Sequence, residues 1–240
     1  MKKLQKELLF IILLGLFLNT PKIFSQNNNE VLTYNWFDKN LGIESLNFNN
    51  GSGHLNFDRT INDHHRYYNT NEFKNGNITY EGQNYYNIDL QYDIFNDQLI
   101  VRPYTESYYI QINLIKEKVD SFKIDNEKFV NLKEVPATFK SGYYEEVIVG
   151  NSNTALYIKH SKAQEKVIKD YSVFVDYKPH FDYLLLKDNK LTLINNKTEI
   201  VKLYPDQKRK INDFFLMNKD LKKTNQVLFM KNLIKYINNF

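Results

Sequence analysis

The chain has 240 residues, with 32 Lys and Arg against 28 Asp and Glu, and it contains no cysteine. The missing cysteine excludes a disulfide framework, cysteine-based zinc sites and thiol nucleophiles. Residues 1–25 hold four lysines and one glutamate, which leaves 28 basic against 27 acidic residues in the rest of the chain. A nearly neutral chain has no bulk attraction to nucleic acid, so we expect no nucleic-acid partner.

Residues 1–25 have the pattern of a secretory signal peptide. Three lysines among the first six residues precede an apolar run over residues 8–18, and Ser25 is a small residue before the expected cleavage site. The run is shorter than the about 20 apolar residues that a membrane-spanning helix needs. We therefore expect an exported protein, periplasmic or extracellular, that is soluble and has no transmembrane segment in the mature chain. Because no cysteine follows the cleavage site, we do not expect a lipoprotein.

Residues 26–50 are polar and rich in asparagine, which predicts a flexible lead-in with one strand or short helix near residues 31–37. From Gly51, short alternations of apolar and polar residues are separated by turn residues, a pattern typical of an antiparallel β meander. Residues 161–178 carry competing helical and extended signals. The expected strands are residues 76–81, 86–92, 98–102, 108–114, 118–124, 128–132, 143–149, 154–160, 183–186 and 191–194.

Helical spacing follows Pro205, over residues 206–217 and 224–238. In the second stretch, Val227, Met230, Ile234 and Ile237 fall on one stripe of a helix. The predicted fold is α+β with β dominant. An antiparallel β meander over residues 51–204, either a sandwich or a partly closed barrel, is followed over residues 205–240 by a helical pair that packs on the sheet.

The stretch from Gly76 to Leu99 follows the pattern G-x-I-x-Y-x-G-x-x-Y-x-N-I-x-L-x-Y-D-I-F-x-D-x-L. This pattern resembles an uncharacterised family of exported proteins from Bacteroidota. Further similar stretches are residues 119–122, 129–132, 142–145 and 156–162 and the helical ending. The resemblance implies export and a β-rich fold, and it brings no catalytic residues with it.

Tyrosine doublets occur at residues 67–68, 85–86, 108–109 and 143–144. Because neighbouring side chains of a strand point to opposite faces, we expect one ring of each doublet to pack inward and the other to face outward. The outward rings would form an aromatic contact surface, unless they only cover neighbouring strands. The candidate binding residues are Tyr67, Tyr68, Tyr85, Tyr109 and Tyr143.

The candidate metal ligands are His54, Asp63 and His64. In a strand, the imidazoles of His64 and His65 would point to opposite faces, so only a tight loop would bring these ligands together. Arg66 beside them disfavours a cation. The alternative is that these histidines have ordinary polar partners at the surface, and this alternative also applies to the isolated His160 and His180.

No phosphate-binding glycine loop and no Gly-x-Ser-x-Gly motif is present. We therefore predict no catalytic residues and no cofactor. The expected function is that of a non-enzymatic binding or scaffolding module of the cell envelope, with an envelope protein or a glycan as its partner. The alternatives are a hydrolase on a β scaffold, which needs histidines or acids to converge in one cleft, and a carrier of a small ligand or lipid, which needs an apolar cavity.

Overall fold

A computed structural model describes residues 26–42, 45–103, 110–133, 135, 139–149 and 154–238. Its central feature is one sheet of 11 antiparallel strands in the order β1-β5-β4-β3-β2-β6-β7-β8-β9-β10-β11. The sheet is open, with β1 and β11 at its two edges. The prediction of a β-dominant antiparallel fold with C-terminal helices is confirmed.

The strands are β1 (Ser52–Gly53), β2 (Lys74–Tyr80), β3 (Gln83–Asp93), β4 (Gln98–Arg102), β5 (Ile112–Asn113), β6 (Val119–Ile124), β7 (Glu127–Leu132), β8 (Gly142–Val149), β9 (Thr154–Lys169), β10 (Ser172–Lys187) and β11 (Lys190–Leu193). The α-helices are α2 (Gln26–Leu41), α3 (Lys197–Leu203), α4 (Lys208–Met217), α5 (Lys219–Thr224) and α6 (Gln226–Asn238). Short 3-10 turns are η2 (Asn47–Asn50), η3 (Lys116–Lys118) and η4 (Pro205–Gln207).

Tight turns with two residues at positive φ join consecutive strands. Asp125 and Asn126 connect β6 to β7 with φ of 52° and 71°, and Asp188 and Asn189 connect β10 to β11 with φ of 50° and 58°. Asp and Asn tolerate this left-handed conformation, and paired positive φ values match the right-handed twist of the strands. The sequence signals for both turns therefore correspond to real hairpins.

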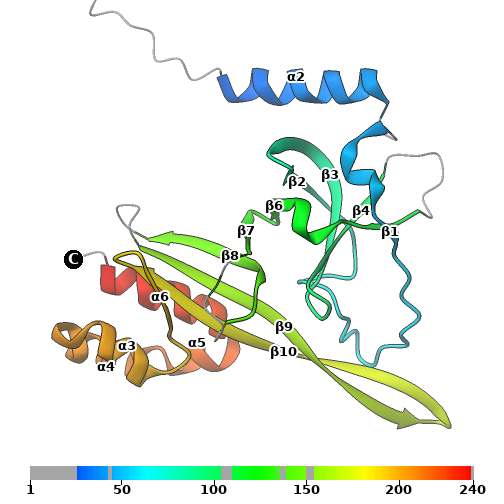
Figure 1. Ribbon diagram of the computed structural model, residues 1–240. Helices are drawn as coiled ribbons and strands as arrows, with labels where there is room; N and C mark the ends of the chain where they lie inside the picture. The colour runs from blue at the N-terminus through cyan, green and yellow to red at the C-terminus, as the bar shows by residue number, and fades with distance from the viewer. Residues whose placement is uncertain are drawn as a thin grey trace, which may run out of the picture.

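The buried apolar side chains form two core clusters along the sheet. The first lies over β2–β4, β6 and β7 and includes Leu90, Tyr92 and Phe129. The second lies between β8–β11 and the C-terminal helices and includes Leu156 and Leu233. Figure 1 shows helices α3–α6 gathered beside β8–β10, while α2 lies over the opposite end of the sheet, near β2 and β3.

Two segments differ from the sequence-based expectation, and a third carries sequence signals for both helix and strand. The lead-in forms the helix α2, and the C-terminal helices begin at Lys197, ahead of the expected start at residue 205. The earlier start has a clear cause, because Asn196 caps α3 by accepting a hydrogen bond from the backbone N–H of Glu199 at 3.0 Å. The ambiguous segment 161–178 belongs to β9 and β10.

Some expectations fall on parts of the chain that the structure does not describe. The signal peptide over residues 1–25 lies outside the described residues, as do residues 108 and 109 of the expected strand over residues 108–114. Of the described part of that strand, Ile112–Asn113 forms β5. Within the described ranges, none of the helices combines the length and apolar character needed to cross a bilayer.

Candidate interaction site: a projecting hairpin and its anchor

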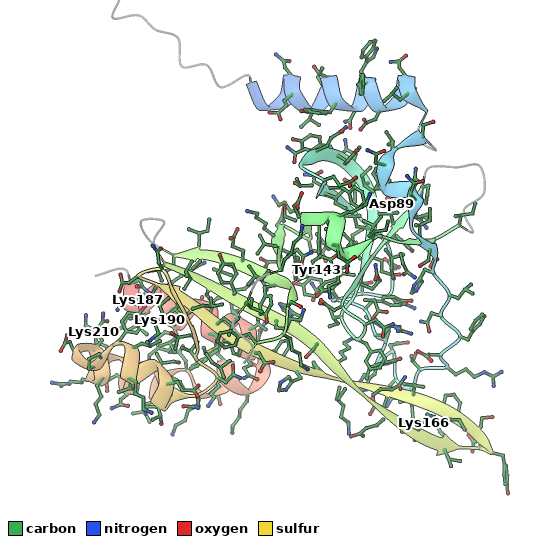
Figure 2. All side chains as sticks on the ribbon, viewed as in Figure 1. Asp89, Tyr143, Lys166, Lys187, Lys190 and Lys210 are labelled. Carbon is green, nitrogen blue, oxygen red and sulfur yellow. The ribbon has the colours of Figure 1, made fainter. Side chains whose placement is uncertain are left out.

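Strands β9 and β10 form a hairpin that extends beyond the rest of the sheet. The two strands pair continuously from Thr154↔Lys187 to Lys169↔Ser172. Only the first residues of β9, Thr154–Ile158, pair with β8. Only the last residues of β10, Leu184–Lys187, pair with β11. Figure 1 shows the outer part of the hairpin projecting away from the helices, and Figure 2 places Lys166 on this part.

The end of the hairpin exposes three apolar side chains, which we call the tip patch: Ile168, Tyr171 and Val173. Their exposed fractions are 80%, 107% and 57%. Ile168 and Val173 are cross-strand partners and therefore share one face of the hairpin. Tyr171 lies in the turn itself, next to Asp170, with φ of 57° and 49° respectively. The tip patch thus has no protein covering it within the described structure.

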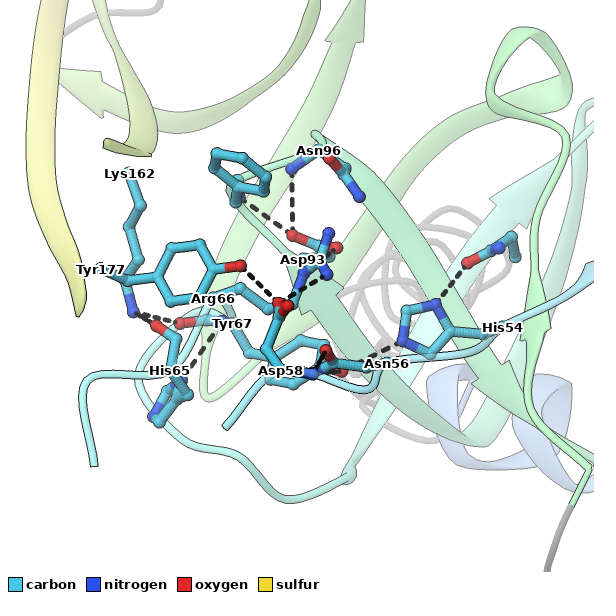
Figure 3. A network of polar contacts seen from close by, with 12 residues as sticks. His54, Asn56, Asp58, His65, Arg66, Tyr67, Asp93, Asn96, Lys162 and Tyr177 are labelled. Carbon is cyan, nitrogen blue, oxygen red and sulfur yellow. Dashed lines mark hydrogen bonds and ion pairs between the residues drawn. The ribbon is translucent and has the colours of Figure 1, made fainter. Parts of the chain in front are cut away.

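A polar network attaches the hairpin to the body of the molecule (Figure 3). We call it the anchor network: Asp58, Arg66, Asp93, Lys162 and Tyr177. Asp93 is fully buried at the end of β3, and its Oδ2 lies 2.8 Å from Nε of Arg66. Arg66 also donates to Asp58 at 3.2 Å, and the hydroxyl of Tyr177 on β10 donates to Asp58 at 2.5 Å. These contacts connect β3, the loop over residues 54–69 and β10.

Further contacts hold the same loop against the hairpin. The ammonium of Lys162 on β9 donates hydrogen bonds to the backbone carbonyls of His65 and Tyr67, the second at 2.9 Å. The backbone N–H of Val175 donates to the carbonyl of Arg59 at 2.8 Å, and Val175 accepts in turn from the N–H of Ile61 at 3.1 Å. The loop therefore contacts the outer half of the hairpin on both of its strands.

Burial shifts the pKa values of Asp93, Lys162 and Tyr177 in this network. It raises the pKa of Asp93, although two backbone N–H groups and the Arg66 guanidinium stabilise the carboxylate. It lowers the pKa of Lys162 to about 8 and raises the pKa of Tyr177 to about 12. Each of these groups already has a protein partner, so the network is suited to holding the hairpin in place.

The four candidate tyrosines that the structure describes do not form an exposed aromatic surface. Tyr67, Tyr68, Tyr85 and Tyr143 are all buried, and Tyr109 lies outside the described residues. The expectation of one outward ring per doublet is wrong for residues 67–68 and 143–144, where both rings are buried.

The two doublets depart from the expected alternation for different reasons. Residues 67–68 lie in a loop that packs against the sheet, so the two-residue period of a strand does not apply to them. Tyr144 is on a strand, but its face of β8 is covered. Its ring lies 5.1 Å from the Lys159 ammonium, and its hydroxyl donates to the carbonyl of Lys140 at 2.5 Å.

The candidate metal ligands are held in separate contacts. His54 uses both ring nitrogens, with Asn113 at 2.9 Å and with the Tyr67 hydroxyl at 3.0 Å. His64 contacts Asp176 at 2.6 Å, and Asp63 is exposed. Across the described part of the chain, no three His, Asp or Glu side chains are grouped so as to hold a metal ion.

The residues of this site were not found by sequence reasoning, although one signal was present. Val173, Val175 and Tyr177 are spaced two apart, as in a strand, and Asp170 is a turn former between two lysine-containing runs. A hairpin over residues 161–178 could have been predicted from these features. The anchor network has no local signal, because Asp58 and Tyr177 are 119 residues apart.

The chain matches no family model, no curated protein and no solved structure in the comparisons.

Proposed function

We propose that the protein is a non-enzymatic binding module of the cell envelope, which contacts a partner protein through the tip patch. The observation that carries the proposal is the exposure of Ile168, Tyr171 and Val173 together at the end of a projecting hairpin. Apolar side chains gathered at one exposed place gain free energy when a partner covers them. Tyrosine is also among the residues that contribute most to protein interfaces.

The contacts that hold the hairpin in place below the tip patch also favour the proposal. Binding is weakened when a flexible segment must be ordered at the same time. Here the hairpin is paired along its full length, and the anchor network attaches its outer half to the loop over residues 54–69. A partner would therefore meet a preformed surface.

The location in the cell envelope rests on the sequence. The basic start, the short apolar run and Ser25 support export, and the near-neutral charge of the chain after residue 25 supports a protein partner over nucleic acid. The proposed partner has an apolar surface that accepts one tyrosine and two aliphatic side chains.

The proposal is tested by quantitative affinity capture from a cell-envelope extract. The variant Ile168→Ser, Tyr171→Ser and Val173→Ser in one chain is compared with wild type. The control is Leu216→Ser, which alters an exposed side chain of similar character on α4. We expect the triple variant to lose the captured protein and the control to retain it. Equal recovery of every protein by all three chains would overturn the proposal.

A further inference from the structure

A hollow lies on the outward face of the sheet, opposite the first core cluster. Ile78, Tyr85 and Phe122 border it but are buried in that cluster, and the residues that alternate with them along β2, β3 and β6 are at least partly exposed. Its volume is about 350 Å³, within the range of about 300–1,000 Å³ that is typical of small-molecule sites. The outward side chains that line it include Asn77, Thr79, Asn84, Tyr86, Ser121 and Lys123.

Three hydrogen-bonded side chains cross the hollow from β6 to β3, and we call them the polar row: Ser121, Thr79 and Asn84. Ser121 and Asn84 are the cross-strand partners of Thr79 on its two sides. The Ser121 hydroxyl donates to Oγ1 of Thr79 at 3.3 Å, and the Thr79 hydroxyl donates to Oδ1 of Asn84 at 2.8 Å. A hydroxyl oxygen has two acceptor positions, so both hydroxyls can still accept a hydrogen bond from a ligand.

Beside the polar row, the hollow has an amide and an aromatic ring. Oδ1 of Asn77 accepts a hydrogen bond from the backbone N–H of Asn87 at 3.3 Å, so the amide nitrogen of Asn77 carries its remaining donors. Tyr86 on β3 has a partly exposed ring, which packs against the ring of Tyr34 on α2 with 6.0 Å between the centroids. A hydrogen-bonding ligand with an apolar face would therefore find partners for both of its surfaces.

Two lysines lie opposite each other at the β6–β7 side of the hollow. Lys123 and Lys128 are cross-strand partners, and Lys123 is also the partner of Asn77 on β2. Like charges at directly opposite positions repel each other. Lys128 pairs with Glu146 at 2.7 Å, whereas Lys123 is exposed and forms no ion pair with any residue that the structure describes. Lys123 therefore brings a positive charge to the hollow that an anionic ligand would neutralise.

We propose that this hollow binds a saccharide unit that carries a carboxylate, such as a uronic acid. The carboxylate would pair with the Lys123 ammonium, and the sugar hydroxyls would bond to Asn77 and to the polar row. The Tyr86 ring would contact the C–H groups on one face of the sugar. A neutral sugar would leave Lys123 unpaired, and a simple anion would leave the polar row unused. This inference does not depend on the tip patch, so either proposal can fail without the other.

Trigalacturonate and its methyl ester are matched probes for this site, because they share the same ring hydroxyls and only the first carries carboxylates. In an NMR titration at low salt, we expect wild-type protein to bind the acid about fivefold more tightly than the ester, since the ester cannot form the ion pair with Lys123. Both probes should shift the side-chain amide resonances of Asn77 and leave the backbone amide of Tyr171 unchanged. Equal affinities, no binding of either probe or unshifted Asn77 resonances would overturn the proposal.

Two variants separate the charge from the hydroxyl contacts. Lys123→Gln removes the ammonium, so it should bind the acid and the ester equally well. Its control is Lys166→Gln, which alters an exposed lysine on the projecting hairpin and should keep the preference for the acid. Thr79→Val removes a hydroxyl of the polar row at nearly constant shape, so it should weaken both probes and keep the preference. A folded Lys123→Gln variant that still prefers the acid, or a folded Thr79→Val variant with wild-type affinities, would contradict the proposed contacts.

Discussion

At the scale of single residues, Gly142 combines a backbone conformation that favours glycine with close neighbouring side chains. It begins β8 with φ of 125°, a conformation that other residues rarely adopt. Its Cα also faces an ion cluster in which Asp97 binds the ammonium groups of Lys116 and Lys159 and accepts from the Tyr92 hydroxyl at 2.6 Å. Glycine is therefore required here by both conformation and space.

The substitution Gly142→Ala should destabilise the protein by about 2–4 kcal/mol, since strained backbone and overpacking each cost about 1–3 kcal/mol. A Cβ at this position would lie 1.9 Å from Oδ2 of Asp97 and 2.8 Å from Nζ of Lys116. Urea unfolding measures the change. The control is Gly53→Ala, where a Cβ would meet no atom within 4 Å. Similar unfolding midpoints for the two variants would show that the side chains of the ion cluster can move aside at little cost in free energy.

The same ion cluster makes a prediction about acid stability. Burial alone would raise the pKa of Asp97, but the ammonium groups of Lys159 and Lys116 lower it below the usual 3.8. As the pH falls, the unfolded chain therefore takes up a proton at Asp97 before the folded chain does. The contribution of Asp97 is present above the unfolded pKa and is lost as the pH falls through the folded pKa.

Asp97→Asn should therefore lose less stability than wild type between about pH 5 and about pH 3. Urea unfolding midpoints measured at several pH values in this range give the dependence of stability on pH for each of the two proteins. Asp188→Asn is the control, because Asp188 is an exposed turn residue that forms no ion pair within the described structure. If Asp97→Asn became unstable as steeply as wild type and the control, the lysine contacts would not govern its titration.

At the scale of elements, the short hairpins have strong local sequence signals and the long one has only a weak signal, on β10. Turns such as Asp125–Asn126 are encoded by adjacent residues, and the strands beside them alternate clearly. In the outer part of β9, by contrast, Ala163, Gln164, Glu165 and Lys166 are all exposed, so no buried face produces an apolar alternation. These residues also have high helix propensity. The hairpin is held by contacts with distant segments, which local patterns do not reveal.

The anchor network should therefore control local separation of the loop over residues 54–69 from the outer half of the hairpin. Tyr177→Phe removes the hydroxyl that donates to Asp58 and accepts from Gln164 at 2.9 Å. We expect the amide of Val175, which donates to the carbonyl of Arg59, to exchange with solvent about tenfold faster. Hydrogen exchange followed by NMR measures this rate.

The matched control for this change is Tyr171→Phe, which removes a hydroxyl from the exposed ring at the tip of the same hairpin. Its Val175 amide should exchange at the wild-type rate. If Tyr177→Phe also left this amide unchanged, the backbone contacts alone would hold the loop, and the side chains of the anchor network would be dispensable for that purpose.

At the scale of the whole molecule, β8 connects the two core clusters. Tyr143 near its start belongs to the first cluster, and Val149 at its end belongs to the second. Glu145 lies between them and binds Lys231 of α6. Because one continuous strand contributes to both clusters, loss of packing under the helices should also weaken the sheet that carries the first cluster.

Leu233→Ala tests this coupling, because Leu233 is fully buried in the second cluster. We expect a loss of about 2–5 kcal/mol in the free energy of unfolding. Far-UV circular dichroism follows the helices, and near-UV circular dichroism reports mainly on the buried tyrosines, which include Tyr80, Tyr85, Tyr92 and Tyr143 in the first cluster. Both signals should shift to the same lower urea midpoint.

The control is Leu228→Ala, which changes an exposed residue of the same helix and should shift neither midpoint appreciably. A near-UV midpoint that stays at the wild-type value while the far-UV midpoint falls would mean that the two clusters unfold independently.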